Sequence, residues 1–176
     1  SEYHQHYDLM IWIFLTIDYF IDKLIGDLQK LKKDDLKDNE IVSAILEEGK
    51  NKYGLSFDFL HFAALAGLFP PKRNILKYWS SNEEVFLSFV KKEGKIGIEH
   101  FMQALVLYFI RKYKGELDKY AQTFMKKLVD DNILSEKFVI DWFDKVIRLD
   151  KDSKIYDKKA EKKFRDLVEK FVEWLK

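Results

Sequence analysis

Apolar residues recur at intervals of three and four along most of the chain, which is the spacing of one face of an α-helix. The pattern is cleanest after residue 116, where it runs without a break through Leu117, Tyr120, Ala121, Phe124, Met125, Leu128 and Val129. No stretch shows the strict alternation of apolar and polar residues that is typical of a half-buried strand. The pattern therefore predicts an all-α protein.

The apolar periods and the residues that interrupt them predict about nine helices. Gly54 suits a left-handed stop after the second helix, Ser81 and Glu84 have the spacing of a capping box, and Ser135 and Asp157 are suitable N-caps. Gly94 and Gly97 mark a further boundary. We expect helices at 8–31, 39–53, 56–68, 71–79, 81–93, 98–113, 117–129, 135–147 and 157–175.

Short connections between these helices predict consecutive antiparallel pairs. Pairs that recur about every 40 residues are typical of HEAT-type arrays. The sequence shows no strong internal repeat, so the spacing of the helices alone supports this architecture. We expect one HEAT-like domain over residues 1–176, as a fragment of a longer protein.

The composition excludes several classes of site. The chain has 176 residues and no cysteine, which rules out disulfides and thiolate zinc sites and favours a reducing compartment, the cytoplasm. The apolar run at 9–17 is too short to span a hydrocarbon core of ~30 Å. Lysine and arginine (31) nearly balance aspartate and glutamate (30), so any electrostatic function must depend on local patches.

Candidate catalytic chemistry is sparse. The histidines stand at positions 4, 6, 61 and 100, and only the first two are neighbours. We expect no metal site and no cofactor, and we interpret His61 and His100 as helix-surface or half-buried residues. No phosphate loop, nucleophile elbow or zinc helix is present, so we expect no enzyme. Core packing explains the aromatic residues Phe101, Phe109, Phe124 and Phe138 better than base stacking does.

A first acidic segment lies at 130–144, where five acids and one lysine give a local charge of −4. The acids are Asp130, Asp131, Glu136, Asp141 and Asp144. We expect Phe138, Val139, Trp142, Phe143 and Val146 to form the inward face of its helix, with the acids flanking it. A solvated polar face would produce a similar pattern.

The last predicted helix carries opposite charges at its two ends. An apolar face of Ala160, Phe164, Leu167, Val168, Phe171, Trp174 and Leu175 should point inward, and Asp166, Glu169 and Glu173 should form an exposed acidic stripe. The first half holds Lys158, Lys159, Lys162, Lys163 and Arg165. This order is unfavourable for the helix dipole, which favours anions at the N-terminus and cations at the C-terminus. A binding role would explain it.

The stretches LVDDNILSEKFVIDWFDK (128–145) and AEKKFRDLVEKFVEWLK (160–176) resemble the two aromatic and acidic boxes of the carboxy-terminal HEAT-like domain of eukaryotic translation initiation factor 5. The ending Phe171, Trp174 and Leu175 is the most specific feature. Related domains occur in the epsilon subunit of initiation factor 2B and in factor-5-mimic regulators. The resemblance covers 101–176.

The resemblance implies a cytoplasmic protein-binding hub that recognises lysine-rich segments of the beta subunit of initiation factor 2, and initiation factors 1 and 3. It assigns the acids of both segments to partner binding, and Trp142 and Trp174 to a structural platform. The family's GTPase-activating function belongs to an amino-terminal zinc-ribbon domain that is not in this sequence. We expect a monomer. The alternative is an RNA-contacting scaffold that uses Arg111, Lys112, Lys114 and the cluster at 158–165.

Overall fold

The helices of this chain follow the predicted order. The computed structural model describes residues 12, 15, 19, 23, 37–69 and 74–176. Within these residues there are eight α-helices and no strand, so the all-α prediction is confirmed. The helices are α2 (Asp38–Asn51), α3 (Phe57–Leu68), α4 (Ile75–Tyr78), α5 (Glu83–Glu93), α6 (Lys95–Leu107), α7 (Ala121–Asp130), α8 (Glu136–Phe143) and α9 (Lys158–Leu175). Most of the predicted helix at 8–31, and the predicted start of the fourth helix at Pro71, lie outside the described residues.

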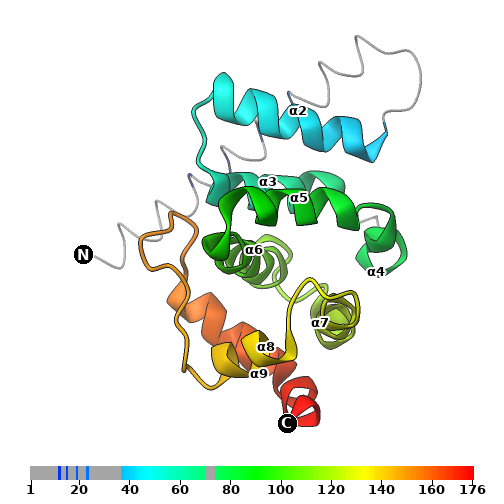
Figure 1. The fold of residues 1–176 in the computed structure, drawn as a ribbon, viewed down its shortest axis with the longest axis vertical. Helices are drawn as coiled ribbons and strands as arrows, with labels where there is room; N and C mark the ends of the chain where they lie inside the picture. Colours follow the sequence, from blue (N-terminus) through cyan, green and yellow to red (C-terminus); the bar gives the residue numbers. More distant parts are fainter. Residues whose placement is uncertain (1–11, 13–14, 16–18, 20–22, 24–36, 70–73) are drawn as a thin grey trace.

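The helices are stacked in layers along the longest axis of the molecule (Figure 1). Helix α2 lies at one end, α3 and α5 form the next layer, α6 lies in the middle, and α7, α8 and α9 form the other end. Helix α6 contacts α3, α5 and α9, and α9 contacts both α7 and α8. This layered arrangement is HEAT-like, as the helix spacing predicted.

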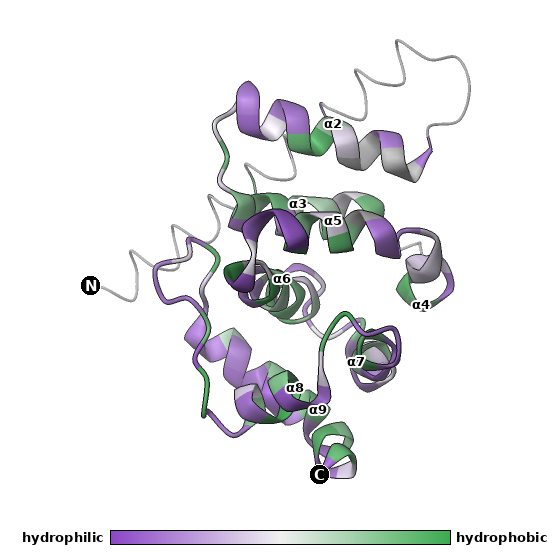
Figure 2. Ribbon diagram, in the orientation of Figure 1, coloured by the Kyte–Doolittle hydropathy of each residue, from purple (hydrophilic) through white to green (hydrophobic). Residues whose placement is uncertain are grey.

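Large aromatic side chains fill the centre of the stack. Trp79 stacks on Phe86 with ring centroids 4.9 Å apart, and it meets Phe124 edge-on at 5.1 Å, which links α5 to α7. Phe101, Phe109 and Phe124 are buried and Phe138 is half-buried, so core packing does account for these rings. Figure 2 shows the hydrophobic residues concentrated in α3 and α6, and hydrophilic residues along the beginning of α9.

Two of the predicted N-caps are confirmed. The Ser135 side chain accepts a hydrogen bond from the amide of Phe138, and Asp157 accepts one from the amide of Ala160. Ser81 is not a cap, because a short 3-10 turn, η1 (Trp79–Ser81), runs up to Asn82, and α5 begins after Asn82. These caps fix where α8 and α9 begin and therefore which residues face the core.

Glycines have two different roles in the helix boundaries. Gly54 and Gly94 have positive φ angles of 63° and 68°, which residues with side chains rarely adopt. Gly94 lies at the boundary between α5 and α6, and Gly54 lies in the connection between α2 and α3. Gly97 was expected at a boundary but lies inside α6. A Cβ there would lie 2.9 Å from the Cα of Val90, so Gly97 permits the close approach of α5 and α6.

The end of α6 continues into a π-helical turn, η2 (Tyr108–Lys112), within the predicted helix at 98–113. The Tyr108 hydroxyl in this turn donates a hydrogen bond of 2.7 Å to the carbonyl of Phe69. Arg111 reaches across to α9, where its Nε lies 2.8 Å from Asp157 Oδ2 and its Nη2 lies 3.3 Å from Oδ1. The same carboxylate thus caps α9 and binds α9 to η2.

A candidate protein-binding surface on the last two helices

Trp142 of α8 lies buried against α9. Its Nε1 donates a hydrogen bond of 3.1 Å to Glu161 Oε1, and its ring packs against Phe164 with centroids 6.0 Å apart. The side chain has no exposed surface, so the predicted structural role of Trp142 agrees with its position. Half-buried Phe138 and Phe143 pack on the same core. These contacts hold α8 in place beside α9.

Arg165 was expected to belong to an exposed basic cluster, and its position differs from this expectation. Its Nη2 lies 2.6 Å from Glu161 Oε1, and its guanidinium carbon lies 5.1 Å from the centre of the Trp142 ring. Only 16% of the side chain is exposed. The i, i+4 spacing of Glu161 and Arg165 places the Arg165 guanidinium over the indole ring of Trp142. Its positive charge is therefore paired within the protein.

Trp174 is exposed, and the prediction that it faces the core is wrong. Trp174 is 68% exposed, whereas Val172, two residues earlier on the same helix, is fully buried. The buried side of α9 is centred on Val168, and at ~100° per residue Trp174 lies about 120° away from it, which is the rim of that side. Trp174 stacks on Phe171 with centroids 6.1 Å apart, and Lys126 of α7 lies 5.8 Å from its ring.

Val146 was also expected to face inward, and this expectation is wrong as well. It is 71% exposed, because α8 ends at Phe143 and the chain beyond it no longer follows the helical spacing. Ile147 is half-buried and packs against the core instead.

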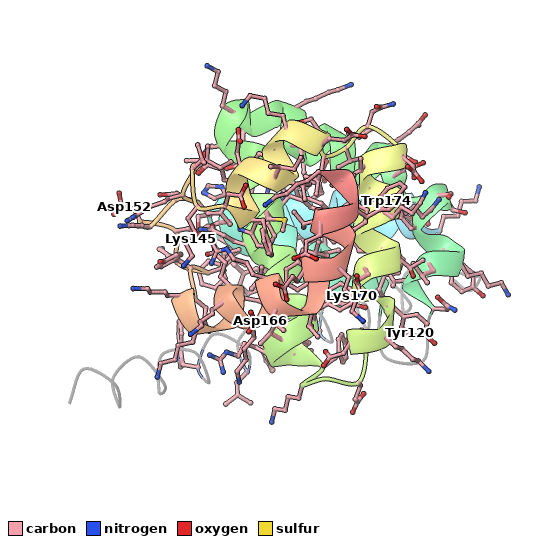
Figure 3. All side chains as sticks on the ribbon, turned by 90° about the horizontal axis from the view of Figure 1, so that it is seen from below. Tyr120, Lys145, Asp152, Asp166, Lys170 and Trp174 are labelled. Carbon is pink, nitrogen blue, oxygen red and sulfur yellow. The ribbon has the colours of Figure 1, made fainter. Side chains whose placement is uncertain are left out.

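Figure 3 shows the surface around α9: Trp174 and Lys170 lie on the side of α9 that faces Tyr120, and Lys145 and Asp152 lie on the opposite side.

Lysines neutralise most of the first acidic segment. The carboxylate of Asp130 lies 2.6 Å from Lys126 Nζ, Asp131 lies 3.4 Å from Lys127, Asp141 lies 2.6 Å from Lys137, and Asp144 lies 2.7 Å from Lys176. Lys126, Lys127 and Lys176 come from outside the segment, so the local charge of −4 overstated how negative this surface is. Glu136 is exposed and forms no ion pair within the described part of the chain.

A second acidic contact lies beneath this surface. Asp131 is half-buried and lies beside Glu83 at the start of α5. Burial, followed by the negative charge of Asp131, raises the pKa of Glu83. Asp131 is therefore held between Lys127 and the carboxyl group of Glu83.

The acidic stripe of α9 keeps its charge. Asp166, Glu169 and Glu173 are all exposed, and none of them forms an ion pair among the residues that the structure describes. They project within about 60° of one another around the helix axis. The basic half of the same helix exposes Lys158, Lys159, Lys162 and Lys163. One helix thus presents unneutralised anions at one end and exposed cations at the other.

A buried polar network, which we did not predict from the sequence, holds the loop between α8 and α9. Glu93 of α5 contacts His61 Nε2 at 2.6 Å and His100 Nδ1 at 2.8 Å, and His100 Nε2 lies 2.9 Å from Asp150 Oδ2. Both histidines are buried, deeper than the helix-surface or half-buried positions that we predicted for them. His61 lies 32 residues from Glu93 and His100 lies 50 residues from Asp150, so helical spacing could not have indicated these two contacts, and only the His100–Glu93 contact joins residues close in sequence, seven apart.

The network changes the protonation of its members. Burial alone would lower the pKa of His100, but the hydrogen bonds with Glu93 and Asp150 outweigh it and raise the pKa to about 9. Burial alone would raise the pKa of Glu93, but the hydrogen bonds with His100 and His61 lower it to about 2. At neutral pH the network is therefore a charged imidazolium between two carboxylates.

The loop is held at a second point by Asp58 of α3. Asp58 Oδ2 accepts hydrogen bonds from the Ser153 hydroxyl (3.1 Å) and the Lys154 amide (2.8 Å). Asp58 Oδ1 accepts from Ser56 and from the Phe59 amide. Gln103 of α6 adds a bond of 2.6 Å to the carbonyl of Asp150. The lysine-rich connection before α9 is thus fixed directly to two earlier helices, α3 and α6.

The polar side chains of this region supply fixed charges that hold the loop in place. Within the described residues, no group of histidine and carboxylate side chains has an arrangement that could hold a metal ion. The residues at positions 4 and 6 lie outside the described part. No helix among the described residues has both the length and the apolar character needed to cross a membrane.

Residues 97–176 match the family model described as W2: eIF4-gamma/eIF5/eIF2-epsilon. The match includes α8, α9 and the loop between them, and therefore every residue of the two charged surfaces. No curated protein and no solved structure matches the chain. Residues 97–176 are therefore similar to W2 domains, the HEAT-like protein-binding modules of translation initiation factors.

Proposed function

We propose that this chain binds lysine-rich segments of another initiation factor through the exposed acids of α9. The observation that carries the proposal is that Asp166, Glu169 and Glu173 point to solvent without a cation of their own. A basic peptide gains charge-assisted contacts there without displacing an internal partner. The W2 match supports this reading, because W2 domains bind partners among the initiation factors.

The first acidic segment has a supporting role in this proposal. Asp130, Asp141 and Asp144 are each held by a lysine, and exposed ion pairs of this kind are worth ~0.2–1 kcal/mol each. A lysine-rich partner can replace these lysines at small cost. Contacts with the first segment should therefore add less affinity than contacts with α9, where the partner displaces no internal cation.

Trp174 extends the proposed surface with an aromatic platform. Its exposed ring already has Lys126 at 5.8 Å, which is the distance range of a cation–π contact. A lysine of the partner can take a similar position over the exposed face. Exposed tryptophans of this kind often supply a large part of the affinity of an interface.

We further propose that the partner is the beta subunit of initiation factor 2, with initiation factors 1 and 3 as further partners, in the cytoplasm. This proposal rests on the resemblance of 128–145 and 160–176 to the boxes of factor 5. The epsilon subunit of initiation factor 2B and the factor-5-mimic regulators are the alternative family members. Comparing the lysine-rich segments of the factor 2 beta subunit with unrelated lysine-rich peptides tests the choice of partner.

The decisive experiment measures binding of a synthetic lysine-rich peptide by titration calorimetry. Glu169→Lys with Glu173→Lys should weaken binding strongly at low salt, because like charges then face each other, and the difference should shrink as salt screens them. The matched control is Glu47→Lys with Glu116→Lys, which changes the total charge equally at two exposed positions outside α9. Equal affinity of both variants and the parent would refute the proposal.

The structure makes the RNA-contacting alternative less favourable. Arg111 is bound by Asp157 and Arg165 is bound by Glu161, so two of the cations that this alternative requires already have partners. Lys158, Lys162 and Lys163 remain exposed. Binding to a single-stranded polyanion with a steep dependence on salt would favour RNA, whereas binding to lysine-rich peptides alone would favour the protein partner.

A further inference from the structure

The charges of α9 are ordered with a mirror antisymmetry about the point between Arg165 and Asp166. Two residues are paired here when they lie equally far before and after that point. For every acid or base between 158 and 173, the paired residue has the opposite charge or is apolar, and it never has the same charge. The four opposite pairs are Arg165 with Asp166, Lys162 with Glu169, Glu161 with Lys170, and Lys158 with Glu173.

The two outer pairs on the solvent side form one stripe. Lys158, Lys162, Glu169 and Glu173 are all exposed, and at ~100° per residue they project within about 60° of one another. No ion pair ties any of the four to another described residue. Arg165 and Glu161 are excluded from the stripe, because they bind each other beside Trp142. We call these four residues the charged stripe of α9.

The order of charges in the charged stripe makes the isolated helix less stable. Its cations lie in the N-terminal half and its anions in the C-terminal half, which opposes the helix dipole. The last turn of α9 has no basic residue, although basic residues there would be favourable. A partner that brings anions to the first half and cations to the second half would remove this unfavourable arrangement. A second α9 in antiparallel orientation has this order of charges.

We infer that two copies of this chain associate through the charged stripes of their α9 helices, antiparallel about a two-fold axis. A two-fold axis passing between residues 165 and 166 places Lys158 opposite Glu173 of the second copy, and Lys162 opposite its Glu169. The symmetry repeats both contacts, so one register satisfies all four charges on each copy. The interface is polar, and we expect it to be weak and sensitive to salt.

This inference departs from the expectation of a monomer, and it does not rest on the proposed function. It has a consequence for that function, because the dimer covers Glu169 and Glu173. A lysine-rich partner and a second copy would then compete for the same two carboxylates. Self-association would hold the acidic surface closed until a more basic segment displaces the second copy.

The test uses three variants of the full chain and sedimentation equilibrium at low and high salt. The acidic-face variant carries Lys158→Glu and Lys162→Glu, the basic-face variant carries Glu169→Lys and Glu173→Lys, and the swapped variant carries all four substitutions. All four positions are exposed, and circular dichroism checks that each variant is folded. The swapped variant keeps the antisymmetric order with its signs reversed.

We expect the parent and the swapped variant to self-associate at low salt, with an affinity that falls by about tenfold or more at high salt. Each half variant alone should be monomeric, and an equimolar mixture of the two should associate at least as tightly as the parent. A monomeric parent together with a monomeric mixture would overturn the inference. Undiminished self-association of both half variants would overturn it as well.

Peptide titrations on the same samples separate this inference from the proposed function. The acidic-face variant keeps Glu169 and Glu173, so it should still bind a lysine-rich peptide although it no longer self-associates. Self-association of the parent without any peptide binding would support the dimer and refute the proposed function. Peptide binding with a monomeric parent would do the reverse.

Discussion

The indole nitrogen of Trp142 and the carboxylate of Glu161 form a buried hydrogen bond of 3.1 Å between two helices that are separated by the longest loop of the charged region. The same oxygen, Glu161 Oε1, accepts a second bond of 2.6 Å from Arg165 Nη2, so the buried carboxylate has both a neutral and a charged donor. A buried charge without such partners would be costly. The contact therefore fixes how α8 sits on α9.

Replacing Trp142 should destabilise the fold. Trp142→Ala should lower the free energy of unfolding by ~3–5 kcal/mol, because it empties a buried site and removes a donor from Glu161. Trp142→Phe, which keeps a ring beside Phe164 and loses only the donor, should cost less, ~1–3 kcal/mol. Urea denaturation followed by circular dichroism measures both. An alanine variant as stable as the parent would contradict the buried position of Trp142.

Trp174→Ala should behave differently from Trp142→Ala. The ring is mostly exposed, and its loss should change stability by about half a kcal/mol or less. Affinity for a lysine-rich peptide should fall, because the ring offers a cation–π contact. The measurement pairs a thermal melt with calorimetry on one sample. A melting temperature lowered as far as in Trp142→Ala would show that Trp174 supports the core after all.

The two tryptophans show what the sequence could and could not predict. Helical spacing identified α8 and α9 and placed Trp142 inside, because a strong apolar period extends over the whole of each helix. The same spacing placed Trp174 inside, and here it failed. Trp174 lies at the rim of the apolar side, and the neighbours of a helix decide how far its buried side extends. Val172 took the buried position because α7 and α8 meet α9 on that side.

The same distinction between what a single helix determines and what its neighbours determine applies to the charged surfaces. The positions of the α9 acids followed from helical geometry alone, because a single helix fixes them. The net charge that the first acidic segment presents depends on three lysines outside it. Lys126 and Lys127 of α7 and Lys176 form ion pairs with Asp130, Asp131 and Asp144 respectively. Only Lys137 belongs to the segment itself. Local charge counts omit such partners, which is why the segment had appeared so acidic.

Removing these lysines should therefore expose the first acidic segment. Lys126→Gln, Lys127→Gln and Lys176→Gln together free three carboxylates and lower the net charge by three. Affinity for a lysine-rich peptide should rise, most clearly at low salt. The matched control replaces Lys91, Lys92 and Lys95, which are exposed near the end of α5 and the start of α6. Equal gains in both variants would show that net charge alone acts.

Stability should depend on pH through His100. Its pKa in the folded protein is about 9, above the ordinary value of 6.5, so its contribution is complete below pH 6.5 and is lost as the pH rises through 9. Glu93 acts in the opposite direction, because its pKa of about 2 lies below 4.5, and its contribution is lost as the pH falls from 4.5 toward 2. Stability from this network should be greatest between pH 4.5 and 6.5.

The check is a series of urea denaturations from acid to alkaline pH on the parent and on His100→Gln. The variant should be less stable at pH 6, and the fall in stability between pH 6.5 and 9 should be largely absent from it. Nuclear magnetic resonance of the imidazole carbons should show protonated His100 at neutral pH. A His100 that titrates near its ordinary value would contradict the charged network between Glu93 and Asp150.

Gly97→Ala tests the contact between α5 and α6. The added methyl group would press against the backbone of Val90, with its Cα at 2.9 Å, and backbone moves less easily than a flexible side chain. Overpacking of this kind costs ~1–3 kcal/mol, although alanine is otherwise the better helix former. Thermal denaturation measures the loss. Increased stability would mean that the two helices can separate without cost.

The anchoring of the loop before α9 bears on where the W2 match begins. Asp58 binds the loop directly and Glu93 holds His100, which contacts the loop, and both precede residue 97, the first residue of the match. A truncation at 97 would leave His100 without Glu93, and Ser153 and Lys154 without their acceptor. We therefore expect the region that carries the family signature to depend on the helices before it. A fragment that keeps Ser56, Asp58 and Glu93 should retain these contacts, whereas one that begins at residue 97 should lose them.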